Sequence, residues 1–247
     1  MRLNNFSLLV LLSFIVSVFG QLPSLGIKQD QAAKSQSRFL WSSVATYDSP
    51  TYDLFTGDEL YGLARQAWQE MAADWEVQKS VRGNRPGMMG ALTVDNSVYF
   101  SSSAKGDNFM YNYVAPDEQP LEVQAALKRC ETSMASLTGD DGKPHRTMAS
   151  CAEIMALHQF YQDPDVDAAT KANPGKMRVV AFGQGRKNKE GRPFPPCGDE
   201  NAWGCDQFTK NQGIEVPPIP STVPDKDPAV TPVSTKQVII CAGGAPA

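Results

Sequence analysis

A cysteine and a glutamate two residues apart are the first residues in this chain whose types could perform chemistry together. Cys151 and Glu153 stand near the start of an amphipathic helix predicted from Thr147 to about Tyr161. Unsatisfied backbone N–H groups and the positive end of the helix dipole favour anionic groups there and lower the pKa of a thiol. The pair could be a metal ligand and a proton carrier, or two ordinary helix residues.

A second pair of cysteines follows downstream. Cys197 and Cys205 lie in "PPCGDENAWGC" and flank the start of another predicted helix. Two helix N-termini that present thiolates can converge on one tetrahedral zinc ion and leave its fourth position open for water. The sequence therefore contains the parts of a possible zinc site.

The number of cysteines bears on how they are used. The chain has five, namely Cys130, Cys151, Cys197, Cys205 and Cys241. Five cysteines cannot all pair within one chain, so either one thiol stays free or an odd number serves another purpose. Three metal ligands and one disulfide between Cys130 and Cys241 would account for all five.

The first residues of the chain have the pattern of a secretory signal peptide. A basic start, an apolar run from Leu8 to Phe19 and the small residue Gly20 follow one another. The run is too short to span a bilayer comfortably, and no stop-transfer pattern follows it. We predict cleavage after Gly20 and a secreted product without a membrane attachment; a buried N-terminal helix is the alternative.

The remaining chain is long enough for one large domain and is mildly acidic. Loss of Arg2 leaves 22 of the 23 basic residues against 27 acidic ones, a net charge of −5. This balance argues against a general affinity for nucleic acid, which requires a basic surface. The basic stretch "GRKNKEGR", residues 185–192, is predicted to be a solvated loop.

Hydrophobic spacing and turn residues predict the elements that must position these side chains. The predicted elements are a helix over 57–75, a hairpin over 87–104 with its turn at 95–96, a helix over 120–137, a helix over 147–161, a strand over 176–183, a short helix over 205–213 and a further strand in "GIEVPPI". This mixed order suits an α/β fold with helices on both faces of a sheet.

With these elements in place, the sequence resembles the cytidine deaminase-like superfamily. The signature of that superfamily is His or Cys followed by Ala-Glu on one helix, then Pro-Cys with a further Cys at the start of the next helix. The matching residues are Cys151-Ala152-Glu153, Pro196-Cys197-Gly198 and Cys205. The hairpin before the first motif and the strand between the motifs also fit. The resemblance implies a three-layer α/β/α fold with a mixed central sheet.

The resemblance further implies roles for the residues that match. Cys151, Cys197 and Cys205 would hold zinc, whereas Glu153 would carry a proton from the zinc-bound water to a ring nitrogen and then to the leaving amine. The substrate would be a nucleobase, either free, in a nucleoside or in a nucleic acid. A secreted toxin or effector role is implied by resemblance alone. His145 and Trp203 are possible residues of the substrate site.

One departure from the superfamily pattern leaves two alternatives open. The superfamily usually places its last two cysteines two residues apart, but seven residues separate Cys197 from Cys205. A glycine stands at each end of this stretch, so it could loop out and return Cys205 to the metal. It could equally be closed by a Cys197–Cys205 disulfide. The second functional hypothesis is accordingly a non-catalytic, disulfide-stabilised secreted binding or effector protein on the same fold.

Four regions are predicted along the chain. They are the signal peptide over 1–20, an extended N-terminal segment over 21–57, the deaminase-like domain over 58–216 and a Pro-rich tail over 217–247. The tail contains "KQVIICAGG", which could form a last strand. The pattern predicts no oligomeric state.

Overall fold

The computed structural model of the chain describes residues 23–35, 38–78, 85–106, 109–112, 122–138, 143–185, 190–198, 202–224 and 230–240. The predicted signal peptide lies outside these residues, as do Cys241 and residues 186–189 of the basic stretch. Among the described residues, no helix is both long and apolar enough to cross a membrane.

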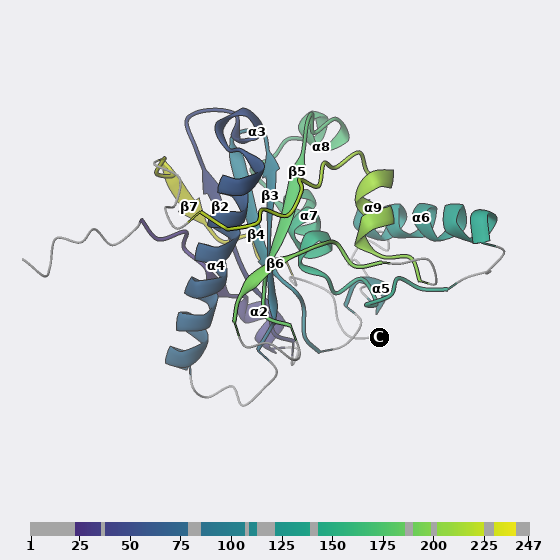
Figure 1. Ribbon diagram of the computed structural model, residues 1–247, viewed down its shortest axis with the longest axis horizontal. Coiled ribbons are helices and arrows are strands. Elements are labelled where there is room, and N and C mark those ends of the chain that lie inside the picture. Colours follow the sequence, from purple (N-terminus) through teal and green to yellow (C-terminus); the bar gives the residue numbers. More distant parts are fainter. Residues whose placement is uncertain are drawn as a thin grey trace, which may run out of the picture.

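A seven-stranded sheet forms the centre of the molecule (Figure 1). Its strands are β1 (Lys28–Gln29), β2 (Trp41–Thr46), β3 (Met88–Val94), β4 (Ser97–Ser102), β5 (Arg178–Gly183), β6 (Arg192–Phe194) and β7 (Ser234–Lys236). They are ordered β1-β2-β4-β3-β5-β6, and β7 also pairs with β2. All pairings between these strands are antiparallel, which corrects the predicted mixed sheet.

What remains of the expected mixed character is one isolated parallel bridge between Arg178 and Glu215. The bridge lies in "GIEVPPI", where a full strand was predicted. Pro217 and Pro218 follow directly and have no backbone N–H to donate, so the segment cannot extend the ladder along β5.

Helices cover both faces of the sheet, as predicted (Figure 1). They are α2 (Gln31–Ser35), α3 (Thr51–Leu54), α4 (Gly57–Gln78), α5 (Phe109–Asn112), α6 (Glu122–Thr138), α7 (Ala152–Gln162), α8 (Ala168–Ala172) and α9 (Cys205–Asn211). The long helix α4 packs on one face and α7 on the other. In Figure 1, α6 and α9 lie beyond α7, on the side away from α4.

The sheet separates two apolar cores because successive side chains of a strand point to opposite faces. Ala91 and Phe100 belong to the core under α4, which also contains Trp41. Their strand neighbours Leu92 and Tyr99 belong to the core shared with α6, α7 and α9. The side of the sheet that carries α7 also carries the candidate site.

The segment predicted as an extended lead-in, residues 21–57, contributes to the sheet. Strand β2 pairs with β4 from Ser42↔Ser101 to Thr46↔Ser97 and is buried along most of its length. Two fully buried serines, Ser42 and Ser43, conceal its apolar alternation in the sequence. At the other end of the chain, β7 precedes most of the predicted "KQVIICAGG" strand, whose last residues lie outside the described part.

Candidate metal centre

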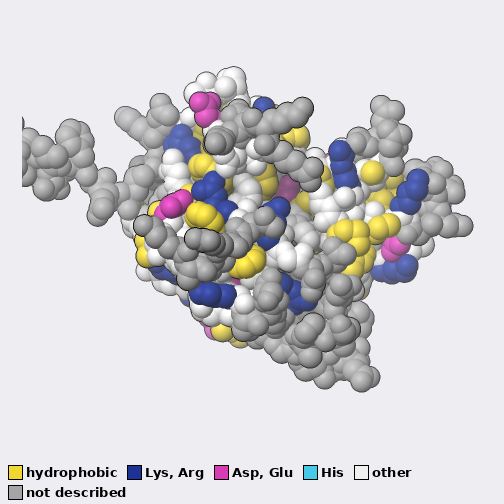
Figure 2. All heavy atoms as spheres, turned by 90° about the horizontal axis from the view of Figure 1, so that it is seen from below, with side chains coloured by type: hydrophobic (Ala, Val, Ile, Leu, Met, Phe, Trp, Pro, Cys, Tyr) yellow, Lys and Arg dark blue, Asp and Glu magenta, His cyan; other side chains and the backbone are white. Residues whose placement is uncertain are grey.

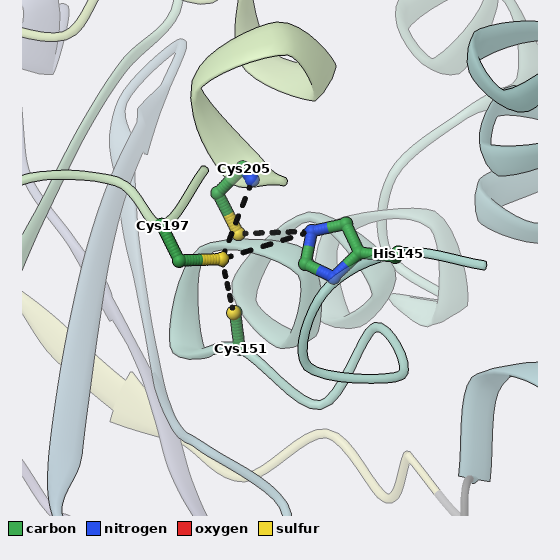
Figure 3. Close-up of side chains that lie close together, drawn as sticks. All are labelled: His145, Cys151, Cys197 and Cys205. Carbon is green, nitrogen blue, oxygen red and sulfur yellow. Dashed lines mark hydrogen bonds between the residues drawn. The ribbon is translucent and has the colours of Figure 1, made fainter. Parts of the chain in front are cut away.

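Four side chains converge between the N-termini of α7 and α9 (Figure 3). The possible ligand atoms of His145, Cys151, Cys197 and Cys205 all lie within 4.8 Å of one another. The Sγ atoms of Cys151 and Cys197 are 3.2 Å apart. His145 Nε2 is 3.6 Å from the Cys205 Sγ and 3.9 Å from the Cys197 Sγ. The three predicted cysteines therefore meet at one point.

Two of the thiols occupy helix N-termini. Cys151 is the N-cap of α7, and Cys205 is the first residue of α9. Helix α7 begins at Ala152 and not at the predicted Thr147, because Met148 and Ala149 adopt left-handed φ angles of +53° and +55°. Their side chains give no sequence signal for this conformation, which folds the preceding loop back towards the sulfur atoms.

The insertion between the last two cysteines returns the chain to the cluster. The Cys205 N–H lies 3.5 Å from Cys197 Sγ, and the Asp206 N–H donates to the Cys197 carbonyl at 3.1 Å. A Cβ atom on Gly204 would overlap that carbonyl, so glycine is required for this close approach. Residues 199–201 of the insertion lie outside the described part.

A second glycine brings α7 close to the sheet. A Cβ atom on Gly90 of β3 would lie 2.9 Å from the carbonyl carbon and oxygen of Ala152. Ala152 stands between Cys151 and Glu153, so the backbone of β3 directly supports the turn that carries both functional side chains.

The described cysteines form no disulfide. Cys130, Cys151, Cys197 and Cys205 are all free thiols. The alternative of a Cys197–Cys205 disulfide is therefore wrong. The predicted disulfide between Cys130 and Cys241 is also contradicted at Cys130, whose free thiol is buried in the core beside α7; Cys241 itself lies outside the described residues.

Glu153 is buried beside the cluster. Its side chain belongs to the first turn of α7, only 7% of the residue is exposed, and its Oε2 atom is 3.8 Å from Cys205 Sγ. Burial raises the pKa of Glu153 to about 7, and the negative charge of Cys197 adds to this effect. The predicted proton carrier thus lies next to the predicted ligands and apart from bulk water.

The three thiols do not ionise equally. The hydrogen bond with Cys151 lowers the pKa of Cys197 far below its usual range and raises that of Cys151. Burial raises the pKa of Cys205. Negative charge therefore gathers on one sulfur, and a cation is needed to hold three thiolates together. A cluster of sulfur and nitrogen donors is compatible with zinc.

A cleft of about 550 Å³ opens next to the cluster. Cys151, Glu153 and Cys197 line it, together with two cations, Lys105 and Arg146. Apolar side chains and three hydroxyl-bearing residues complete the wall, among them Met88, Met148, Phe194, Ser103, Thr147 and Ser150. Figure 2 shows Lys and Arg side chains scattered over one face of the molecule rather than gathered into a single basic patch.

His145 and Trp203, the two possible substrate-lining residues, have other surroundings. Trp203 is only 5% exposed, and its indole N–H donates to the Lys143 carbonyl at 2.7 Å. The rings of His145 and Trp203 pack edge to face, with their centroids 5.1 Å apart. Neither residue is among those that line the cleft. The sequence missed His145 as a member of the cluster; its place six residues before Cys151 was the one available signal.

The chain was also compared with known proteins. No protein-family model matches it, and neither a curated protein nor a solved structure does so.

Proposed function

We propose that this protein is a zinc-dependent hydrolase that removes an exocyclic amine from a nucleobase. One observation carries the proposal: the buried carboxyl group of Glu153 and two thiols of a metal-ligand cluster face the same cleft. Metal-assisted hydrolysis requires these three parts, namely a cation site, an acid–base group within reach of it and a cavity for the substrate.

The residues of the chain have distinct tasks in this proposal. Cys151, Cys197 and Cys205 would hold the ion, which when bound supplies a water molecule with a pKa lowered to about 7. Glu153 would accept one proton of the attacking water and pass it to the ring nitrogen, and would then accept the second proton of that water and deliver it to the leaving amine. In the overall reaction, the oxygen of water replaces the amine nitrogen on the ring carbon, and ammonia leaves.

The cleft suits a base that carries a phosphate. Its volume falls within the range of about 300–1,000 Å³ that is usual for small-molecule sites. Met88 and Phe194 offer apolar surface for a planar ring, whereas Lys105 and Arg146 could meet a negative group attached to it. Glu153 is the one acid among the described residues that line the cleft, and it is placed at the cluster.

Secretion remains part of the proposal on the sequence pattern of residues 1–20 alone. Nothing in the fold depends on it, because the described residues begin after the predicted cleavage site.

A non-catalytic binding or effector protein is the second candidate. Four possible ligand atoms within 4.8 Å could also enclose a zinc ion completely, as in structural sites that have no open position. In that case the ion would stabilise the junction of α7 and α9, and the cleft would bind a partner without chemistry.

The test combines metal analysis with ammonia release. Zinc per chain is measured by elemental analysis of the purified protein, and ammonia is measured with cytosine and adenine bases, nucleosides, nucleotides and single-stranded oligonucleotides. We expect one zinc per chain in the wild type and in Glu153→Gln, with ammonia release lost by about 100-fold or more in the variant. The matched control is Glu76→Gln, an exposed position on α4.

The outcomes separate the two candidates. Zinc bound without ammonia release from any of these substrates favours the structural site. Full turnover by Glu153→Gln removes Glu153 from the reaction and contradicts the proposed mechanism.

A further inference from the structure

The ring of His145 faces two backbone donors on the side away from the sulfur atoms. Its Nδ1 atom accepts hydrogen bonds from the N–H of Thr147 at 3.2 Å and from the N–H of Ala149 at 3.3 Å. The left-handed residues Met148 and Ala149 turn the loop so that both amides point at the ring. The hydroxyl group of Thr147 also lies 3.2 Å from Nδ1.

These contacts determine which ring nitrogen carries the proton. A backbone N–H can only donate, so Nδ1 must present its lone pair to the two amides. A neutral imidazole with an unprotonated Nδ1 carries its proton on Nε2. His145 is 1% exposed and its ring packs against Trp203, so water cannot easily replace the two amides.

Ligation through Nε2 would require the opposite arrangement. The metal needs the lone pair of Nε2, which moves the ring proton to Nδ1, where it would face two N–H groups. Histidines that bind metals almost always donate their other N–H to a carboxylate, a carbonyl or water. The loop from Thr147 to Ala149 aims two backbone N–H donors at the place where such a ligand requires an acceptor, and among these contacts only the hydroxyl group of Thr147 could accept.

On the other side of the ring, Nε2 points at two sulfur atoms (Figure 3). It lies 3.6 Å from Cys205 Sγ and 3.9 Å from Cys197 Sγ. Thiolates are good acceptors for an N–H donor because the hydrogen bond is assisted by their charge. The geometry is that of a donor shared by two cysteine ligands.

We infer that His145 is a positioning residue that donates its Nε2 proton to the sulfur atoms of Cys205 and Cys197 and is not itself a metal ligand. This inference rests on the metal site of the proposed function and deepens it. Three cysteines then hold the ion, and its fourth position stays open. The hydrogen bond also withdraws charge from a site with three thiolates, which favours retention of a cation that still acts as a Lewis acid.

The direct test is a ¹H–¹⁵N spectrum of the histidine rings in zinc-loaded, tag-free protein. The sequence contains only two histidines, His145 and His158, so the assignment requires one variant. Signals lost in His145→Gln belong to His145; if that variant does not fold, His158→Gln assigns them by elimination. We expect a protonated Nε2 and an unprotonated Nδ1 on His145. A proton on Nδ1 together with a zinc-bound Nε2 would overturn the inference.

Zinc affinity, measured by competition with a chelator, gives a second readout. Loss of a group that supports a ligand typically costs 10–100-fold in metal affinity. We expect His145→Gln, whose amide can still donate to sulfur, to lose no more than this, and the matched ligand variant Cys205→Ser to lose clearly more. Equal losses in the two variants would contradict the inference.

The ring spectrum and the ammonia assay test the role of His145 and the deaminase proposal independently of each other. Zinc-loaded protein that shows the Nε2 proton but releases no ammonia rejects the deaminase proposal and leaves the role of His145 intact. A zinc-bound Nε2 in a protein that releases ammonia rejects the proposed role of His145 and leaves the deaminase proposal intact. Failure of the wild type to bind zinc overturns both.

Discussion

Replacing Gly90 of β3 with alanine should disturb the candidate site, because Gly90 lies directly against Ala152 of α7. The new Cβ atom would lie 2.9 Å from the carbonyl carbon and oxygen of Ala152 and 3.2 Å from its Cβ. Atoms of the backbone cannot rotate out of the way, so α7 must move away from β3 by a few tenths of an ångström or more. Overpacking of this kind costs about 1–3 kcal/mol of unfolding free energy.

The displaced residue is the link between Cys151 and Glu153, so the effect should also reach the metal. A misplacement of about 1 Å in a catalytic group can cost roughly 100-fold in rate. We therefore expect Gly90→Ala to lower the urea midpoint, to weaken zinc binding by at least about 10-fold and to lower ammonia release by more than its zinc occupancy explains.

Gly62→Ala is the matched control for this experiment. Gly62 lies inside α4, and a Cβ atom added there meets nothing within 4 Å. Alanine in a helix interior is more stable than glycine by about 0.5–1 kcal/mol, so this variant should be slightly stabilised and should bind zinc normally. If Gly90→Ala matches the wild type in both urea midpoint and zinc affinity, then β3 does not support α7 as described.

Two further predictions concern stability. Burial lowers the pKa of His158 from 6.5 to about 4, so between these pH values the unfolded chain binds a proton that the folded chain does not. The free energy of unfolding should therefore be fully present above pH 6.5 and fall by roughly 3 kcal/mol as the pH drops to about 4. Urea midpoints of metal-free protein should show a shallower fall in His158→Gln. Lys236 contacts Asp163 at 2.6 Å and Asp165 at 2.7 Å, and Asp163 is buried, so Lys236→Met should lower the free energy of unfolding in urea by about 1–2 kcal/mol. The control Lys128→Met breaks an exposed ion pair and should cost less than about 0.5 kcal/mol. Equal effects of the two substitutions would contradict the role of burial.

Elements with strong local signals were predicted well. The apolar spacing from Leu60 to Trp75 predicted α4, and Asp95-Asn96 marked the turn between β3 and β4. The three cysteines could be predicted as ligands because a thiol at the start of a helix is a pattern of neighbouring residues, which can be recognised without knowing which distant segments complete the site. The three predicted ligands accordingly come together in the structure.

The parts that were missed depend on contacts distant in sequence. Ser42 and Ser43 give β2 no apolar alternation, and only pairing with β4 makes it a strand. The direction of β5 relative to β3 is decided by the route of the chain between them, which contains strand β4 and the four helices α5 to α8. His145 joins the cluster through the left-handed turn at Met148, a conformation that methionine seldom adopts and that its sequence context does not signal.

The choice between a structural and a catalytic site turns on what surrounds the sulfur atoms rather than on the sulfur atoms themselves. A structural zinc ion gains nothing from a carboxyl group buried at 7% exposure beside its ligands, because desolvation of that group costs free energy. It also gains nothing from a histidine whose Nδ1 faces two amide donors, since that ring cannot complete the coordination shell without losing both hydrogen bonds. A site that must admit water and substrate needs both features: an acid in reach of the open position, and a fourth neighbour that supports the thiolates without closing it.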